Sequence, residues 1–280
     1  MLTIIHHPQP ARSDIDRITA EIPGELEPCE GFCRLHHHRP ASADSLPGLR
    51  AALPFDLNPV PERFDAEGAR LVISDMDSTL INIECVDEIA DFAGVKPQVA
   101  AITEAAMRGE LDFAASLTQR VATLKGLDEA VLAQVFDERL SPNPGAEALL
   151  AGLKQRQMRF ALVSGGFTFF TERLKQQLGL DYTRANLLEI EGGCLTGKVV
   201  GDIIDAQAKA VFLRELCEEL GLEANQTIAM GDGANDLKMM AAAGMGVAYR
   251  AKPKVQAQSD VVLNHSGLDA VLHFLPGARE

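Results

Sequence analysis

The 280-residue chain has no Trp and only two Tyr, and basic residues are few: 26 Lys and Arg stand against 40 Asp and Glu, a formal net charge of −14. Few aromatic rings are available to stack on the bases of single-stranded nucleic acid. A negative surface also repels nucleic acid phosphates and anionic lipids. We therefore expect neither nucleic acid nor a membrane as a partner. An anionic small-molecule substrate would require a local positive charge.

The chain also lacks an apolar run of the roughly 18–20 residues that a membrane span needs. Its first ten residues, MLTIIHHPQP, have no basic start followed by an apolar core, so they do not resemble a signal peptide. The cysteines are odd in number and irregularly spaced: Cys29, Cys33, Cys85, Cys194 and Cys217. This usage favours reduced thiols, and we expect a cytoplasmic protein.

Short apolar runs that end in small polar residues predict buried strands at residues 71–73, 160–163, 227–230, 247–249 and 261–263. Runs that are apolar on both faces are typical of parallel strands covered by helices. The helices predicted at 168–178 and from 205 to about 220 each stop at a glycine, a common C-cap. Residues 187–204, with a central Gly-Gly, suggest a hairpin. The pattern predicts an α/β fold with a doubly wound, mainly parallel sheet.

The chain divides into three parts on this pattern. Residues 66–83 and 142–280 form the predicted α/β core, and residues 84–141, helical in composition, form a small helical cap over the strand ends. Residues 1–65 are rich in Pro and His and have weak periodicity, so they are described as a short N-terminal extension of unknown role, ending in a linker-like stretch at 54–61.

Cys29 and Cys33 precede three consecutive histidines at 36–38, which could suggest a metal site in the N-terminal extension. The spacing suits tetrahedral zinc poorly. A polar surface stretch is the simpler interpretation.

Three polar clusters directly follow predicted strands: Asp75 with Asp77, Ser164 with two glycines, and Asp232 with Asp236. Ligands bind at the carboxyl ends of strands in an open parallel sheet, so these clusters should converge. Paired carboxylates repel each other unless a cation lies between them, and Mg²⁺ prefers such oxygen ligands.

Each cluster has a simpler interpretation when it is taken alone. A lone Asp-x-Asp is usually a turn or a helix cap. A Ser-Gly-Gly at the start of a helix can bind an anion, but it is more often an ordinary turn. A single Lys, here Lys209, is normally a solvated surface residue. The glycine-rich run at 231–236 lacks the spacing and the terminal Glu of a calcium loop.

In order and approximate spacing, these segments resemble the four motifs of the haloacid dehalogenase-like superfamily. The resemblance covers about residues 66 to 275 and rests on Asp75-Met76-Asp77-Ser78-Thr79, Ser164-Gly165-Gly166, Lys209 and Gly231-Asp232-Gly233-Ala234-Asn235-Asp236. Within that superfamily the chain is most similar to phosphoserine phosphatases. Glu84, the run at 106–113 and Arg120 resemble the substrate-cap segment of that family.

The resemblance implies that Asp75 attacks phosphorus and becomes phosphorylated, which splits one difficult displacement into two easier steps. Asp77 is then the general acid and base. The implied cofactor is Mg²⁺, held by Asp75, by the backbone carbonyl of Asp77 and by Asp232. Asp236 would orient the metal waters or Lys209.

The same resemblance assigns the equatorial phosphoryl oxygens to Ser164, the Gly165 N–H and Lys209, which supplies the local positive charge. Asn235 would contact the substrate. The remaining motif residues would support the site: Ser78, Thr79 and Gly166.

In the cap, the resemblance implies that Glu84 receives the substrate ammonium and Arg120 clamps its carboxylate. Met107 and Phe113 would shield the pocket from water. The implied reaction is hydrolysis of O-phospho-L-serine to L-serine and phosphate, the last step of serine biosynthesis. The sequence does not fix the oligomeric state, and a homodimer is one option.

Two other functions stay open. The first is a phosphatase or phosphotransferase for a related small phosphomonoester, such as phosphohomoserine or a sugar phosphate; a sugar phosphate has no ammonium or carboxylate for Glu84 and Arg120 to recognise. The second is an inactive amino-acid-binding regulator. That function predicts loss of Asp75, Asp77 or Lys209, and all three are present.

Overall fold

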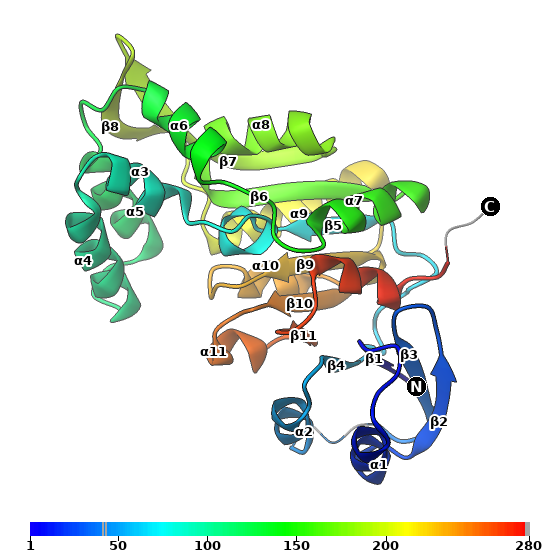
Figure 1. Ribbon diagram of the computed structural model, residues 1–280. Coiled ribbons are helices and arrows are strands. Elements are labelled where there is room, and N and C mark those ends of the chain that lie inside the picture. The colour runs from blue at the N-terminus through cyan, green and yellow to red at the C-terminus, as the bar shows by residue number, and fades with distance from the viewer. Residues whose placement is uncertain (41, 43, 278–280) are drawn as a thin grey trace.

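The computed structural model describes residues 1–40, 42 and 44–277. A seven-stranded sheet lies between two layers of helices, with helices gathered at one end of it and a separate four-stranded unit near the N-terminus (Figure 1). No helix within the described residues is long and apolar enough to cross a membrane.

The large sheet is parallel except at one edge, where β7 and β8 pair antiparallel. Its strand order is β11-β10-β9-β5-β6-β7-β8. The bounds are β5 (Leu71–Ser74), β6 (Arg159–Phe167), β7 (Tyr182–Glu191), β8 (Cys194–Val200), β9 (Thr227–Gly231), β10 (Met245–Tyr249) and β11 (Val261–Leu263). Every residue of β5, β9, β10 and β11 is buried, because helices cover both faces. The predicted mainly parallel α/β fold is confirmed.

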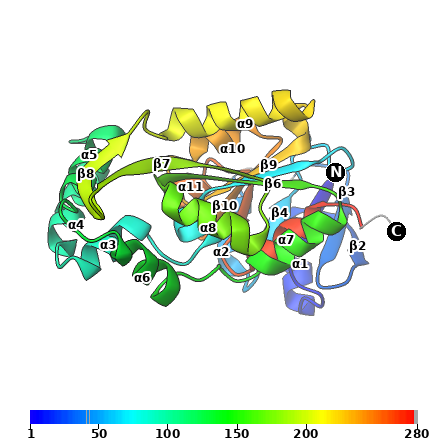
Figure 2. The ribbon, with the colours of Figure 1, turned by 90° about the horizontal axis from the view of Figure 1, so that it is seen from above.

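Helices cover the two faces of this sheet as separate layers (Figure 2). One face packs against α7 (Ala146–Gln155), α8 (Thr168–Leu178) and the 3₁₀ helix η3 (Leu268–Phe274). The other packs against α9 (Ala206–Leu220), α10 (Leu237–Ala242) and α11 (Pro253–Gln256); the short 3₁₀ helix η2 (Ala224–Gln226) precedes β9. Helices α8 and α9 end at Gly179 and Gly221, with φ of 69° and 64°, a backbone conformation that glycine adopts without a Cβ clash.

The helical segment that follows β5 stands at one end of the sheet, where the β7–β8 hairpin meets it (Figure 1). Backbone hydrogen bonds of 2.8 Å join Gly126 N–H to Leu195 O and Leu195 N–H to Leu127 O, so the hairpin holds the cap in place. The bounds of the cap helices are α3 (Cys85–Phe92), α4 (Lys96–Met107), α5 (Phe113–Ala122) and α6 (Ala130–Glu138).

The N-terminal residues form an antiparallel sheet with two helices and their own hydrophobic cluster. The sheet order is β2-β3-β1-β4. The bounds are β1 (Leu2–Ile5), α1 (Arg12–Glu21), β2 (Gly24–Pro28), β3 (Cys33–His37), α2 (Leu46–Ala52) and β4 (Leu57–Pro59). The expectation of a polar surface stretch is therefore wrong, and the proposed linker at 54–61 contains a strand. Ile5, Leu35 and Leu57 are fully buried, which gives this unit a core.

The N-terminal unit docks on the edge strand of the large sheet through two buried polar side chains of the β4 region. Asn58 Nδ2 donates to Val262 O and Asn58 Oδ1 accepts from Val262 N–H, both at 2.9 Å. The Asp56 carboxylate accepts backbone N–H groups of residues 264–266 at 2.8–3.2 Å. These bonds satisfy backbone groups of β11 and the turn after it, and they fix the unit against the core.

Replacing Asn58 by Ala should lower the free energy of unfolding by about 2 kcal/mol, because both backbone groups of Val262 would lose a buried partner. Urea titration of the purified protein measures this change. Asn225→Ala is the matched control, because Asn225 is exposed, and it should change stability by less than about 0.5 kcal/mol. Equal effects of the two substitutions would contradict the docking role of Asn58.

Candidate active site

The central strand of the large sheet places Asp75 between two other polar clusters. β5 pairs in parallel with β6 and β9, with Ser74 in register with Leu162 and with Met230. Asp75 N–H continues the ladder by donating to Met230 O at 3.0 Å. The next residues of β6 and the loop after β9 therefore emerge beside Asp75, and the clusters that are far apart in sequence come together.

A buried lysine joins two of the carboxylates at this edge. Lys209, on α9, is fully buried, and its Nζ lies 2.6 Å from Asp75 Oδ1 and 2.7 Å from Asp236 Oδ1. Burial by itself would lower the pKa of Lys209, but the carboxylates of Asp236 and Asp75 raise it above the ordinary lysine value. The ammonium is thus held in its charged form against Asp75.

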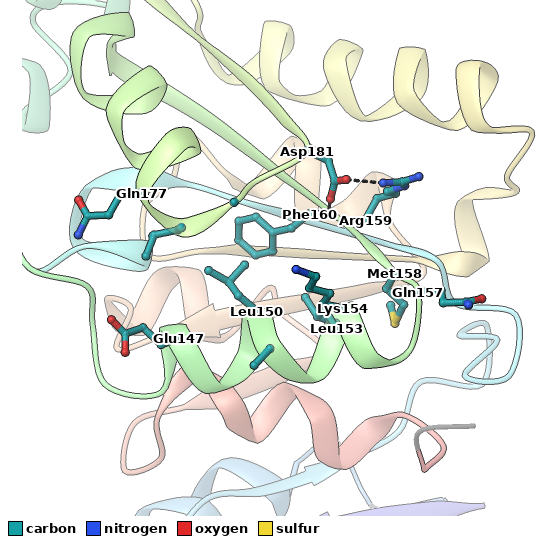
Figure 3. A pocket seen from close by; sticks show the side chains of 13 residues that line it. Glu147, Leu150, Leu153, Lys154, Gln157, Met158, Arg159, Phe160, Gln177 and Asp181 are labelled. Carbon is teal, nitrogen blue, oxygen red and sulfur yellow. Dashed lines mark hydrogen bonds and ion pairs between the residues drawn. The ribbon is translucent and has the colours of Figure 1, made fainter. Parts of the chain in front are cut away.

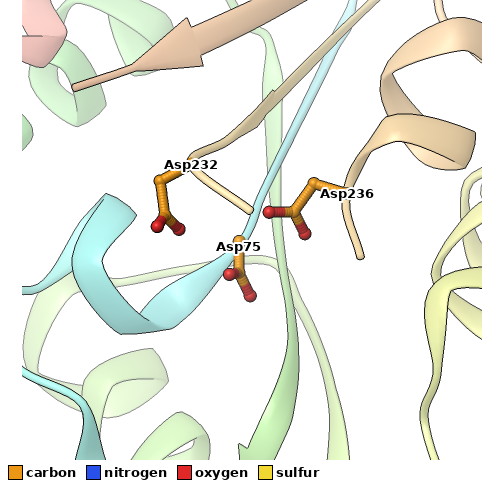
Figure 4. Close-up of side chains that lie close together, drawn as sticks. All are labelled: Asp75, Asp232 and Asp236. Atoms are coloured by element: carbon orange, nitrogen blue, oxygen red, sulfur yellow. The ribbon is translucent and has the colours of Figure 1, made fainter. Parts of the chain in front are cut away.

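Asp75, Asp232 and Asp236 form an acidic group that could hold a metal ion (Figure 4): one carboxylate oxygen from each lies within 4.8 Å of the others. Asp236 uses its two oxygens for Lys209 and for the Gly233 N–H, the latter at 3.0 Å. Asp232 accepts the Thr79 hydroxyl at 3.2 Å with one oxygen only. A second oxygen of Asp75 and of Asp232 remains for a hard cation, which suits an all-oxygen donor set.

Burial, with the nearby Asp236 charge, raises the pKa of Asp232 to about 6, so a cation would relieve charge that is costly here. Within the described residues no second group of this kind occurs. The cysteines and histidines of the N-terminal unit therefore do not form one: Cys33 Sγ instead lies 3.4 Å from Pro8 O.

The turn after β5, η1 (Met76–Leu80), directs Asp77 toward both β6 and the cap. Ser78 has a φ of 56°, a left-handed conformation that is uncommon for a non-glycine residue, and it reverses the chain. Asp77 Oδ1 accepts the Cys85 N–H at 2.9 Å, and Asp77 Oδ2 accepts the Ser164 hydroxyl at 3.2 Å. Burial raises the pKa of Asp77 although these hydrogen bonds oppose it, so this carboxyl group can hold a proton more readily than an exposed aspartate.

The Ser164-Gly165-Gly166 segment is the end of a strand. The helix predicted at 168–178 is confirmed as α8, but β6 continues to Phe167, so the expectation that this segment follows the strand is wrong. The register between β6 and β7 shifts between Val163 and Phe167, and the segment bulges there. Gly166 N–H donates to Ser164 Oγ at 2.7 Å, which fixes the hydroxyl.

The cap packs directly on this bulge through Phe113, the first residue of α5. A Cβ atom at Gly165 would lie 2.6 Å from Phe113 Cζ, closer than real contacts allow. The glycine is therefore needed for the ring to lie over the segment. The contact places Phe113 over this segment, and its role in shielding the pocket from water stays a prediction.

Two charged side chains of the cap region lie near Asp77. Glu84 precedes α3, and its Oε1 accepts the Ser78 hydroxyl at 2.7 Å. Protein packed around the Glu84 carboxyl, with the charge of Asp77, raises its pKa to about 7 although the residue keeps access to solvent. Arg120, on α5, is half-buried, and its Nε has no hydrogen-bond partner among the described residues. Burial lowers the pKa of Arg120, opposed by the carboxylates of Asp87, Glu84 and Asp77.

Asn235 and Met107 are the two predicted site residues that remain to be placed. Asn235 is half-buried, and its side-chain oxygen lies over Gly233. The side chain of Met107 falls outside the described residues.

A surface hollow of about 860 Å³ lies elsewhere, between α7, β6 and α8 (Figure 3). It is lined by residues such as Glu147, Lys154 and Gln177, and it includes none of the predicted site residues.

Two contributors to the site were not found from the sequence. One is the backbone N–H of Cys85, which reaches Asp77 because α3 begins there. The other is Asn186, a buried amide on β7 that bonds to Gly165 O at 2.8 Å. Asn186 lies just before the hairpin predicted at 187–204, and the sequence held no signal for it, because its partners are backbone atoms distant in sequence.

Comparison with known proteins agrees with this geometry. Residues 69–244 match the family model described as haloacid dehalogenase-like hydrolase. A phosphoserine phosphatase of Polaromonas sp. (strain JS666) is 56 % identical over 211 residues, which cover 74 % of this chain and 89 % of that protein.

Two solved structures are similar over most of their length. The unliganded crystal structure of a probable phosphoserine phosphatase from Vibrio cholerae has a TM-score of 0.84 and 39 % identity, over 98 % of this chain and 86 % of that one. A substrate-bound phosphoserine phosphatase complex has a TM-score of 0.70 and 38 % identity, over 74 % of this chain and 99 % of that one. With strand-end carboxylates, a buried lysine and a helical cap in one arrangement, the chain belongs to the haloacid dehalogenase-like hydrolases.

Proposed function

We propose that the protein hydrolyses O-phospho-L-serine to L-serine and phosphate, the last step of serine biosynthesis. The observation that carries this proposal is the buried contact between Asp75, at the end of the central strand, and Lys209 of α9, with Glu84 and Arg120 of the cap region close to Asp77. Phosphoserine phosphatases among the relatives, and a solved complex of such an enzyme with its substrate, support the same substrate. All five cysteines are free, which agrees with a reducing compartment, and we propose the cytoplasm.

In the first step, a carboxylate oxygen of Asp75 attacks phosphorus and the bond to the serine oxygen breaks. Asp77 donates its proton to that leaving oxygen, which its raised pKa favours. In the second step, Asp77 takes a proton from water as this water attacks the phosphorus of the phospho-aspartyl group. Phosphate leaves and Asp75 is regenerated.

The phosphoryl oxygens need positive or donating groups, and this chain carries a net charge of −14. Lys209, Ser164 Oγ and the Gly165 N–H are the proposed donors, because Ser164 and Gly165 lie near the end of β6 and the Nζ of Lys209 reaches from α9 to Asp75. Mg²⁺ is the proposed cofactor; Asp75, Asp232 and the backbone carbonyl of Asp77 would hold it, where it would screen the charge between nucleophile and phosphate.

Specificity for phosphoserine is proposed to come from the cap. Glu84 would bind the ammonium group, and Arg120, whose Nε lacks a partner among the described residues, would bind the carboxylate. A sugar phosphate offers neither group. The half-buried position of Arg120 strengthens its charge interactions relative to water.

Asp75→Asn should abolish turnover of phosphoserine, because an amide is a poor nucleophile. The protein should still fold, but with a lower melting temperature, because Lys209 loses one of its two carboxylate partners and keeps Asp236. Release of free phosphate measures activity, and circular dichroism with thermal melting checks the fold. Normal turnover by a folded Asp75→Asn protein would overturn the assignment of the nucleophile.

Asp232→Asn is the matched control, since it weakens a proposed metal ligand and keeps the nucleophile. Its activity should recover in part as the Mg²⁺ concentration is raised, whereas Asp75→Asn should stay inactive at every concentration. Full activity of the wild-type protein in excess chelator would contradict the proposed need for Mg²⁺.

Arg120→Ala should cost about 2–5 kcal/mol of transition-state binding for phosphoserine, the range for removing one partner of a buried charge pair. The same change should scarcely affect an aryl phosphate, which has no carboxylate. The measurement is kcat/KM for both substrates in the wild type and the variant. An unchanged ratio of the two values would show that Arg120 does not bind the carboxylate.

A further inference from the structure

Asn186 is a buried amide of β7 whose two ends bond to backbone atoms of two different segments, the end of β6 and the segment before α9. It is 1 % exposed, and it is in register with Phe167 at the point where the pairing of β6 and β7 shifts. Its Nδ2 donates to Gly165 O and its Oδ1 accepts from Ile204 N–H, both at 2.8 Å. A carbonyl can only accept and an N–H can only donate, so the orientation of the amide is unambiguous.

The first hydrogen bond fixes the peptide unit between Gly165 and Gly166. The carbonyl of this unit accepts from Asn186, and its N–H donates to Ser164 Oγ at 2.7 Å. Ser164 Oγ in turn donates to Asp77 Oδ2 at 3.2 Å. A continuous chain of hydrogen bonds therefore runs from Asn186 to the proposed general acid, and such chains strengthen their members.

The second hydrogen bond of Asn186 reaches the segment before α9. Ile204 is followed by Asp205, whose side chain caps α9 by accepting N–H groups of Gln207 and Ala208 at 2.8 Å. Lys209 lies in the first turn of that helix. The amide of Asn186 thus spans the gap between the segment that carries Ser164 and the start of the helix that carries Lys209.

We propose that Asn186 is a positioning residue for phosphoryl transfer. Its amide fixes the Gly165–Gly166 peptide relative to the start of α9, and through Ser164 it orients the Asp77 carboxyl before substrate binds. The single hydrogen of the Ser164 hydroxyl then turns to a phosphoryl oxygen. The inference rests on the proposed function in one respect, the role of Asp77 as general acid. The amide of Asn offers the one donor and the one acceptor that this place needs. An ionised Asp offers only acceptors, and Ala offers neither.

The test uses Asn186→Ala and Asn186→Asp in the full chain with two aryl substrates, phenyl phosphate and 4-nitrophenyl phosphate. Both are nearly equal in shape and neither presents a carboxylate or an ammonium to the cap. They differ in the basicity of the leaving oxygen: phenolate is the stronger base, so its departure depends more on a proton from the general acid than that of 4-nitrophenolate. If Asn186 acts through Asp77, kcat/KM for phenyl phosphate should fall about tenfold more than kcat/KM for 4-nitrophenyl phosphate.

Asn58→Ala is the matched control, because Asn58 is also a buried amide that bonds one backbone N–H and one backbone carbonyl, far from the site in the N-terminal unit. It should lower thermal stability and leave the ratio of the two substrates unchanged. Equal losses for both substrates in both Asn186 variants would reduce Asn186 to a structural residue and overturn the inference.

A double-mutant cycle with Ser164→Ala tests whether Asn186 acts through the chain of hydrogen bonds that passes Ser164 to Asp77. The effect of Asn186→Ala on the substrate ratio should nearly disappear when Ser164 is already absent, because both changes break the same chain. Additive effects would also overturn the inference. The proposed function is tested separately: it fails if the wild-type protein does not hydrolyse phosphoserine, whatever the aryl phosphates show.

Discussion

The ion pairs of Lys209 are the constraint around which the site is arranged. A fully buried ammonium is tolerated only because Asp75 and Asp236 each lie within 2.7 Å of it. Those partners come from the central strand and from the loop after its neighbour, while the lysine comes from a helix on one face. Sheet order, the start of α9 and the turn at 231–236 must all be correct for this contact to form. The contact between Lys209 and Asp75 therefore forms only when the core has folded.

A second constraint joins the cap to the core. Phe113 rests on Gly165, where a Cβ atom would collide with the ring, so the cap can approach the end of β6 closely only because glycine occupies that position. The charged residues of the cap region lie close enough to Asp77 for their fields to act on one another. A substrate that binds as proposed would lie between Asp75 at the strand ends and the charged residues of the helical cap.

Most of the core could be predicted because its strands are apolar on both faces and end at small polar residues, as at Ser74 and Gly231. The ends of α8 and α9 were marked by glycines for the same local reason. The N-terminal unit was missed because its strands are only three to five residues long, and one of them, β2, reads GELEP with no buried residue. Hydrogen bonds between distant backbone and side chain, such as those of Asn186 and Asn58, leave no periodic trace in the sequence, and only the fold reveals them.

The docking of the N-terminal unit on β11 has a consequence for the behaviour of the chain during folding. An outer strand of a parallel sheet presents unpaired N–H and C=O groups that can recruit a strand from another molecule. Here Asn58 and Asp56 occupy such groups on Val262 and on residues 264–266. The N-terminal unit therefore covers the edge of the sheet to which a strand of another molecule could otherwise add. It is also synthesised before β11, so its docking surface can be ready when that strand emerges from the ribosome.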